Sequence, residues 1–322
     1  MRALIFGGTG QVGRAVTMAF AQGGWQVHAV TRGRDLAPEV LALAVTPLQA
    51  NASRASLIAA GYDAVIDTLA FTAADAADLM AEPAGHVTVI STASVYADAQ
   101  GRGFERLDNG FPLYPDPIFE DQPLVPAGDG YCAGKVALEE ALQGRAAVLR
   151  PGAIHGIGSR HPREWWFVKR ALDGRSILPL AGGGNTVFHT SSCHGIASLT
   201  LHLAQHRLTG AFNAADPDPL PVHRIAETIA EMMGHRFDLV ANPIGQTPFS
   251  VENTVRLSMA KALATGWDGG PAYGDCLPDY ILWMVSHAQD WKAAFPVFRS
   301  YDSDPFDYAS EDAALAAARP MA

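Results

Sequence analysis

The sequence predicts an α/β protein in which a doubly wound parallel sheet is followed by a smaller C-terminal lobe. Short apolar runs alternate with stretches of helical periodicity in the first half of the chain, which is the pattern of parallel strands joined by crossover helices. The strands are expected at 3–6, 27–30, 45–48, 64–69, 86–91 and 146–149. The helices between them are expected at 12–22, 53–60, 73–81 and 130–142.

The length of the chain favours two lobes. Its 322 residues exceed the roughly 250–300 residues at which a single hydrophobic core stops growing. Residues 1–155 are expected to form the first domain, and 156–322 mainly the second lobe, with some segments returning to the sheet. Helices are expected in this second part near 163–172 and 222–233.

Three glycines follow the first predicted strand and indicate a dinucleotide site. Gly7, Gly10 and Gly13 lie between the apolar strand and the first predicted helix. Glycines at this spacing let the backbone approach a diphosphate, and the unpaired N–H groups of a helix N-terminus attract its negative charge. Three glycines often form only a tight turn, but here strand, glycines and helix come in the order that binding requires.

Tyr131 and Lys135 form the second diagnostic pair. They stand four residues apart at the start of an amphipathic segment, so they share one helix face. Tyrosine is a poor base at neutral pH because its ordinary pKa is about 10, and a nearby ammonium favours the phenolate. An isolated pair of this kind is more often a surface contact. The glycine motif and the strand-end segment 91–96 favour a catalytic role instead.

With these motifs, the chain resembles the short-chain dehydrogenase/reductase superfamily, and specifically its extended, epimerase/dehydratase-like branch. The resemblance covers most of the chain and is strongest over residues 1–156. Segments 7–13, 92–96, 131–135 and 150–152 occur there in the family's order. The resemblance implies a Rossmann-type, NAD(P)-binding domain and a C-terminal substrate-binding lobe.

The resemblance also implies that Thr92, Tyr131 and Lys135 are the catalytic residues. Thr92 stands three residues before the valine of a Val-Tyr pair, as the family's active-site Ser or Thr does. In the reductive direction, Tyr131 is expected to donate a proton to a carbonyl oxygen while the nicotinamide delivers hydride. Thr92 would hold that oxygen. Lys135 would lower the tyrosine pKa and bind the nicotinamide ribose.

NADP is favoured over NAD by the end of the second predicted strand. Thr31 and Arg32 stand where an NAD site normally carries an acidic residue, and Arg34 or Arg14 are expected to assist Arg32. The alternative is that these arginines are solvated surface charges. The resemblance implies further cofactor contacts at Gly7, Thr9, Gly10, Gln11, Val12, Gly13, Asn51, Thr68, Leu69, Ala70, Pro151 and Ile154.

The substrate is expected to differ from that of the nucleotide-sugar enzymes in this branch. Ala153 stands where those enzymes commonly have an asparagine, and Phe188 replaces the arginine that would clamp a sugar-nucleotide diphosphate. A smaller or less anionic carbonyl or alcohol is expected. The candidate substrate contacts are Tyr96, His155, Trp165, Phe188 and His189, with Trp166 as a further one. The two tryptophans could equally be core anchors.

The segment 98–129 interrupts the alternation of strands and helices and carries five prolines. A long ordered loop beside a catalytic strand is usually functional. The alternative is a surface or dimer-facing insertion. In the resembled family, two subunits commonly pair through the helices that follow the fourth and fifth strands, here 73–81 and 130–142, so a homodimer is expected.

Composition favours a soluble enzyme in the cytoplasm with a small-molecule substrate. A formal charge of −10 and a pI near 5.5 argue against nucleic acid as the main partner. Three widely separated cysteines match neither a disulfide framework nor a zinc site, and no metal is expected. The sequence enters the glycine motif without a leader pattern, and no apolar run is long enough to span a bilayer.

Three functions remain open at this point. The first is an NAD(P)-dependent oxidoreductase that transfers hydride between nicotinamide and a carbonyl or alcohol substrate. The second is an epimerase or dehydratase that reduces its bound cofactor transiently. The third is a non-catalytic member of the superfamily, which the presence of Thr92, Tyr131 and Lys135 disfavours.

Overall fold

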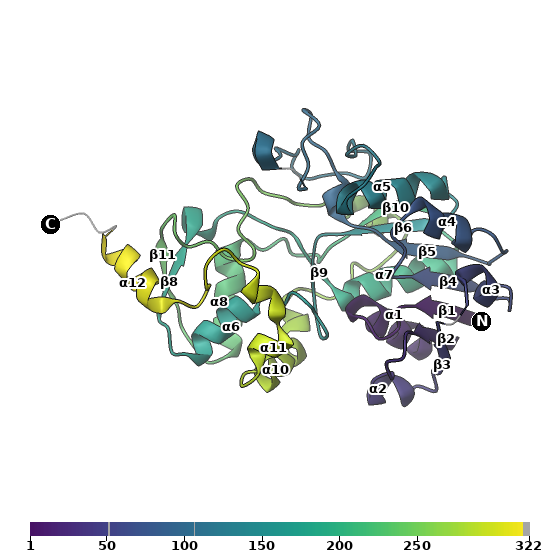
Figure 1. The fold of residues 1–322 in the computed structure, drawn as a ribbon, viewed down its shortest axis with the longest axis horizontal. Coiled ribbons are helices and arrows are strands. Elements are labelled where there is room, and N and C mark those ends of the chain that lie inside the picture. The colour runs from purple at the N-terminus through teal and green to yellow at the C-terminus, as the bar shows by residue number, and fades with distance from the viewer. Residues whose placement is uncertain (51, 106, 318–322) are drawn as a thin grey trace.

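A parallel sheet of seven strands forms the centre of the first lobe (Figure 1). The computed structural model describes residues 1–50, 52–105 and 107–317. Within them, the strand order is β10-β6-β5-β4-β1-β2-β3. The strands are β1 (Arg2–Phe6), β2 (Gln26–Thr31), β3 (Thr46–Gln49), β4 (Ala64–Asp67), β5 (Val87–Ile90), β6 (Ala147–Pro151) and β10 (Gly210–Ala214). The predicted doubly wound fold is confirmed, and its strand order reverses at β1, where such sheets bind ligands.

Helices cover both faces of this sheet. Successive side chains of β1 point to opposite sides, and both sides are apolar, so each face needs its own layer of helices. Ala3 and Ile5 pack with one set of helices, and Leu4 and Phe6 lie in a separate core on the other face. The first face carries α1 (Gln11–Gln22) and α7 (Cys193–His206); the second carries α3 (Arg54–Ile58), α4 (Ala73–Leu79) and α5 (Tyr131–Leu142). The short α2 (Pro38–Leu41) lies between β2 and β3 in the chain.

The six predicted strands lie within two residues of the observed ones. β4 ends earlier than expected, at Asp67, because its carboxylate accepts the backbone N–H groups of Leu69 and Ala70 at 2.6 and 2.7 Å and so turns the chain. Helix α7 and strand β10 come from the part of the chain after residue 155 and complete the first lobe.

The second lobe packs its helices around an aromatic core. Trp165, Phe167, Tyr280 and Phe295 are buried in it together with Ile229. The lobe contains α6 (Trp165–Leu172), α8 (Val222–Met232), α10 (Leu277–Ser286), α11 (Trp291–Ala294) and α12 (Tyr308–Ala317). Two small parallel pairs accompany them, β8 (Ile177–Leu180) with β11 (Asp238–Ala241) and β7 (Ala153–His155) with β9 (Thr190–Ser192). The short α9 (Ala260–Ala264) packs beside β10.

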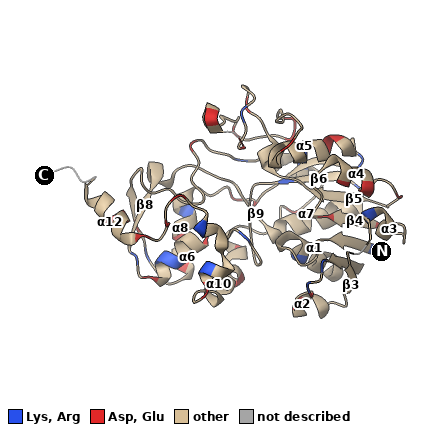
Figure 2. Cartoon of the chain, viewed as in Figure 1, with Lys and Arg blue, Asp and Glu red and all other residues tan. Residues whose placement is uncertain are grey.

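Charged residues are distributed over both lobes and the 98–129 segment, with acidic and basic positions interspersed (Figure 2). In the part of the chain that the structure describes, no helix combines the length and the apolar character needed to cross a membrane.

Candidate active site and cofactor cleft

The glycine motif forms a tight loop between β1 and α1. Gly7 has a φ of +88°, and a Cβ added there would lie 2.3 Å from Thr68 Oγ1. A Cβ on Gly13 would lie 2.0 Å from the carbonyl oxygen of Gly7, so neither position accepts a side chain. Helix α1 begins after Gly10 without a side-chain cap or an acidic residue in its first turn. Its N-terminal N–H groups are therefore available to an anion.

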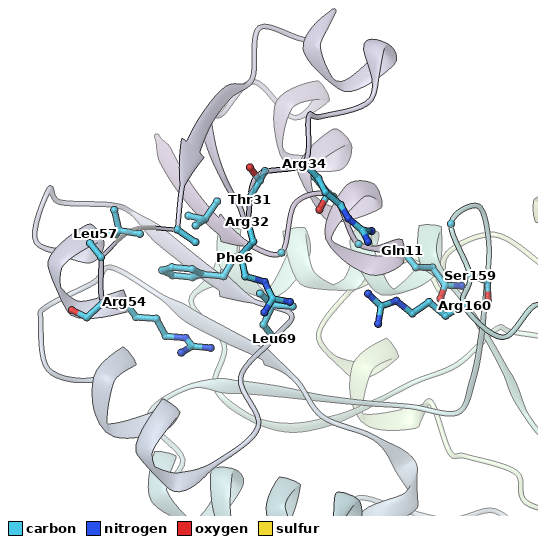
Figure 3. Close-up of a pocket in the computed structure, with 18 of the residues that line it drawn as sticks. Phe6, Gln11, Thr31, Arg32, Arg34, Arg54, Leu57, Leu69, Ser159 and Arg160 are labelled. Atoms are coloured by element: carbon cyan, nitrogen blue, oxygen red, sulfur yellow. The ribbon is translucent and has the colours of Figure 1, made fainter. Parts of the chain in front are cut away.

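A cavity of about 1310 Å³ opens at this loop (Figure 3). It exceeds the roughly 300–1,000 Å³ of common small-molecule sites, as a dinucleotide requires. Of the sequence-predicted cofactor residues, it is lined by Gly7, Thr9, Gly10, Gln11, Thr31, Arg32 and Leu69. The second lobe supplies part of the opposite wall through 158–160, Trp283, Ala293, Ala294 and Pro296. The cleft thus lies between the two lobes.

The other predicted cofactor residues lie outside the lining of this cavity. Val12 and Ile154 pack against apolar clusters, so their side chains are directed into the protein. Thr68 donates its hydroxyl to the carbonyl oxygen of Phe6 at 2.9 Å. Pro151 pairs with Ala214 between β6 and β10. Gly13 and Ala70 are buried, and Asn51 lies outside the described residues.

Arginines dominate the charge of the cleft. Arg32 and Arg34 are exposed and line it, and no carboxylate of the described residues forms an ion pair with either. Arg14, expected as an assistant, instead donates to Glu39 at 2.9 Å and does not line the cavity. Sequence reasoning missed Arg54, whose guanidinium pairs with Asp67 and Asp75. The sequence held one signal for this role of Arg54: Asp67 ends a buried strand, and a buried carboxylate needs a cationic or hydrogen-bonding partner.

Thr92, Tyr131 and Lys135 come together where β5 ends and α5 begins. Tyr131 is the first residue of α5, and its side chain is 53% exposed. Partial burial of the hydroxyl raises the pKa of Tyr131 above its ordinary value, and the nearby Thr92 hydroxyl lowers that pKa by less. Thr92 Oγ1 also accepts the N–H of Ser94 at 3.2 Å.

Lys135 is buried one turn further along α5. Its ammonium donates to the carbonyl oxygens of Ala70 and Ile90, both at 2.7 Å. Burial lowers its pKa to about 8, against the opposing charges of Asp67 and neighbouring carboxylates. The expectation that Lys135 lowers the tyrosine pKa is wrong for this structure, since the ammonium is directed at backbone carbonyls and the pKa of Tyr131 is raised.

Glu105, which sequence reasoning missed, holds the start of α5. Its carboxylate accepts the backbone N–H of Tyr131 at 2.5 Å and that of Cys132 at 3.0 Å. Burial raises the pKa of Glu105, but hydrogen bonds from the backbone of 131–133 lower it by more. Gly130 has a φ of +109°, and a Cβ there would lie 2.5 Å from the carboxylate, so the glycine makes room for this cap. Glu105 belongs to the 98–129 segment.

Four of the predicted substrate contacts are interior residues. Tyr96 donates to Asn213 Oδ1 at 2.6 Å, and His155 Nε2 pairs with Asp216 at 2.8 Å. His189 accepts the N–H of Leu257 and donates to the carbonyl oxygen of Asp216. The prediction that these side chains line an open pocket is corrected, because each is at most 3% exposed and each makes at least one hydrogen bond to the protein.

The fourth interior residue, Trp165, lies in the aromatic core of the second lobe beside Phe295, and Trp166 is buried there too. Both tryptophans are therefore core anchors, the alternative that the sequence also allowed, and not residues of an open substrate pocket. Phe188 is only half-buried and stacks on Phe104 of the 98–129 segment, with ring centroids 5.9 Å apart.

The 98–129 segment also borders a second cavity of about 620 Å³. Leu107 and Phe111 from the segment face Thr186, Val222 and Glu252 of the second lobe across it. The segment therefore contacts both the start of α5 and the second lobe, which favours the functional interpretation over that of a surface insertion.

Comparison with known proteins agrees with this geometry. Residues 1–107 match the family model described as the RmlD substrate binding domain. A 3-diazoavenalumate denitrifying reductase of a Streptomyces species is 28% identical over 73% of this chain and 82% of its own length. The 2'-dehydrokanamycin reductase of Streptomyces kanamyceticus is 26% identical over 76% of this chain and 70% of its own length.

The fold itself is shared with solved structures. The UDP-glucose 4-epimerase of Thermus thermophilus, determined with NAD, superposes with a TM-score of 0.64 at 18% identity. The superposition covers 88% of this chain and 99% of the epimerase.

Proposed function

We propose that the chain is a member of the extended short-chain dehydrogenase/reductase superfamily and an NADP-dependent oxidoreductase that reduces a carbonyl group of a small molecule. The family match over residues 1–107, the two reductase relatives and the shared fold support this proposal. One observation carries the proposal: Thr92 and Tyr131 lie at the carboxyl edge of the parallel sheet, the same edge at which the glycine loop after β1 borders the arginine-lined cleft. The two curated relatives, both named reductases, support the direction of the reaction.

The raised pKa of Tyr131 suits proton donation. A hydroxyl whose pKa lies above 10 keeps its proton at neutral pH and can give it to an oxygen on which negative charge develops. The Thr92 hydroxyl holds the same oxygen and orients it toward Tyr131. When bound, the nicotinamide supplies the hydride.

The residues of the cleft fit a dinucleotide. The loop of Gly7 and Gly13 leaves no space for side chains and presents the uncapped start of α1 to a diphosphate. Leu69 lines the cleft for the adenosine half. The ammonium of Lys135, which donates to two backbone carbonyls here, would also hold the nicotinamide ribose hydroxyls.

Arg32 and Arg34 would recognise the additional phosphate of NADP. Both line the cleft at the end of β2, and in the described part of the chain neither has a carboxylate partner. Calorimetric titration should give tighter binding of NADPH than of NADH, and Arg32→Ala should erase the difference. Equal affinities in the parent protein, or an unchanged preference in the variant, would contradict the assignment.

An epimerase or dehydratase is the second candidate, because the fold is shared with a UDP-glucose 4-epimerase. Such an enzyme returns the hydride to its substrate, so its dinucleotide stays bound and is not consumed. Purified protein should therefore be tested for a retained dinucleotide and for net absorbance change at 340 nm in a screen of carbonyl substrates. Exchange of the cofactor with net oxidation supports the reductase, and a tightly retained, non-exchanging cofactor supports the alternative.

A further inference from the structure

Arg160 reaches the cofactor cleft from the second lobe. It lies in the turn that links β7 to α6, where Gly156 and Gly158 have φ values of +132° and +84°. This turn packs against the start of α1: Gln11 Nε2 donates to the carbonyl oxygen of Gly156 at 3.3 Å. A Cβ on Gly158 would lie 3.7 Å from the Cα of Gln11. The backbone of the second lobe thus touches the first residue of α1, whose N-terminus is open to an anion.

The guanidinium groups of Arg160 and Arg32 point toward one another from opposite walls of the cavity (Figure 3). Arg160 is exposed, and among the described residues no carboxylate forms an ion pair with it. Asp78, a carboxylate in the lining, already accepts the backbone N–H groups of Arg54 and Ala55 at 2.8 and 3.2 Å. Like charges that face one another across a cleft attract an anion between them.

We propose that Arg160 binds the diphosphate of the dinucleotide from the second lobe, so that the cofactor bridges the two lobes. The proposal rests on the proposed function. The diphosphate is the group assigned because the turn of Arg160 packs on Gln11 at the N-terminus of α1, whereas Arg32 and Arg34 follow β2. A guanidinium forms paired, charge-assisted hydrogen bonds with phosphate oxygens.

The test measures binding and not turnover. Calorimetric titrations of the full-length protein with NADPH, NADH and ADP-ribose are compared for the parent, Arg160→Gln, Arg160→Lys and Arg236→Gln. All three ligands contain the diphosphate, so Arg160→Gln should weaken each by a similar factor of about ten, the low end for a charged hydrogen bond at an exposed site. Arg160→Lys should stay within about threefold of the parent because it keeps the charge. Arg236 is exposed and makes no ion pair within the described chain, which makes Arg236→Gln the matched control.

The outcomes separate this inference from the proposed function. Unchanged affinities in Arg160→Gln, with the parent binding normally, overturn the role of Arg160 alone. Weakening confined to NADPH also overturns it, because Arg160 would then contact the 2'-phosphate. A parent protein that binds none of the three ligands overturns the proposed function itself. A Tm equal to that of the parent protein, measured by thermal denaturation, shows that each variant is folded.

Discussion

Replacing Glu105 tests whether the 98–129 segment positions the proton donor. The carboxylate accepts two backbone N–H groups at the start of α5, one of them from Tyr131. Glu105→Gln keeps one acceptor oxygen and turns an NH₂ group toward the second N–H, while Glu105→Ala removes both acceptors. Loss of a helix cap costs about 0.5–2 kcal/mol. Because Glu105 is exposed and screened by solvent, we expect Glu105→Ala to lower the free energy of unfolding by about 1 kcal/mol. A loss of this size lowers Tm by roughly 2–4 °C in a protein of this size.

The effect on turnover should be larger than this loss of stability. Displacement of a reacting group by about 1 Å can cost about 10²-fold in rate, and a frayed first turn displaces Tyr131 partly, so kcat should fall about tenfold for Glu105→Ala. KM and dinucleotide affinity should stay within about threefold, because the cleft lining does not include Glu105. The assay is steady-state oxidation of NADPH at 340 nm on an identified substrate, together with thermal denaturation.

Glu231→Gln provides the control, since Glu231 is exposed in the second lobe and its side chain makes no hydrogen bond or ion pair within the described chain. Glu105→Gln should recover part of the lost kcat. A kcat unchanged in Glu105→Ala, or a fall in which dinucleotide affinity drops equally, would refute the positioning argument.

Three further predictions follow from the site and its helices. Tyr131→Phe should lower turnover by roughly 10²–10⁴ while dinucleotide affinity, measured by calorimetry, stays within a few-fold, because only the transferred proton is lost; retention of most turnover with chemistry rate-limiting would contradict the role. The pKa of Lys135 is lowered to about 8 by burial, so its ammonium is present below that pH and lost above it. Dinucleotide affinity should therefore weaken between pH 7 and 9 in the parent. The Lys135→Met variant should bind the dinucleotide weakly, with an affinity that does not change over the same pH range. Light scattering at micromolar concentration should report a homodimer paired through α4 and α5, and a monomer would exclude it.

The first half of the fold could be predicted because short, continuous sequence patterns specify each of its strands and helices. Strands such as β1 are continuous apolar runs, and the glycines after it stand in the order of strand, glycines and helix that a dinucleotide site requires. The carboxyl edge of a parallel sheet then gathers Thr92 and the start of α5 without further knowledge. Local pattern therefore located the cavity at the glycine loop, and the catalytic role of Thr92, Tyr131 and Lys135 stays a prediction.

The remaining contacts could not be predicted because they join distant parts of the chain. The partners of Tyr96 and His155 lie 117 and 61 residues away, so their burial leaves no periodic signal near them. Glu105 caps a helix 26 residues further on from within an irregular loop. Arg160 acquires its place only when the second lobe packs on α1.

The edge strand β10 determines when the first lobe can be completed during synthesis. It pairs with β6, and α7 before it covers β1 with Ala197 and Ala204, yet both elements follow the first part of the second lobe in the chain. When only residues 1–155 have left the ribosome, α1 alone covers one face of the sheet and the edge strand β6 lacks its partner β10. A shortened protein ending there should aggregate, and chimeras that exchange lobes between relatives need junctions on both sides of 193–214.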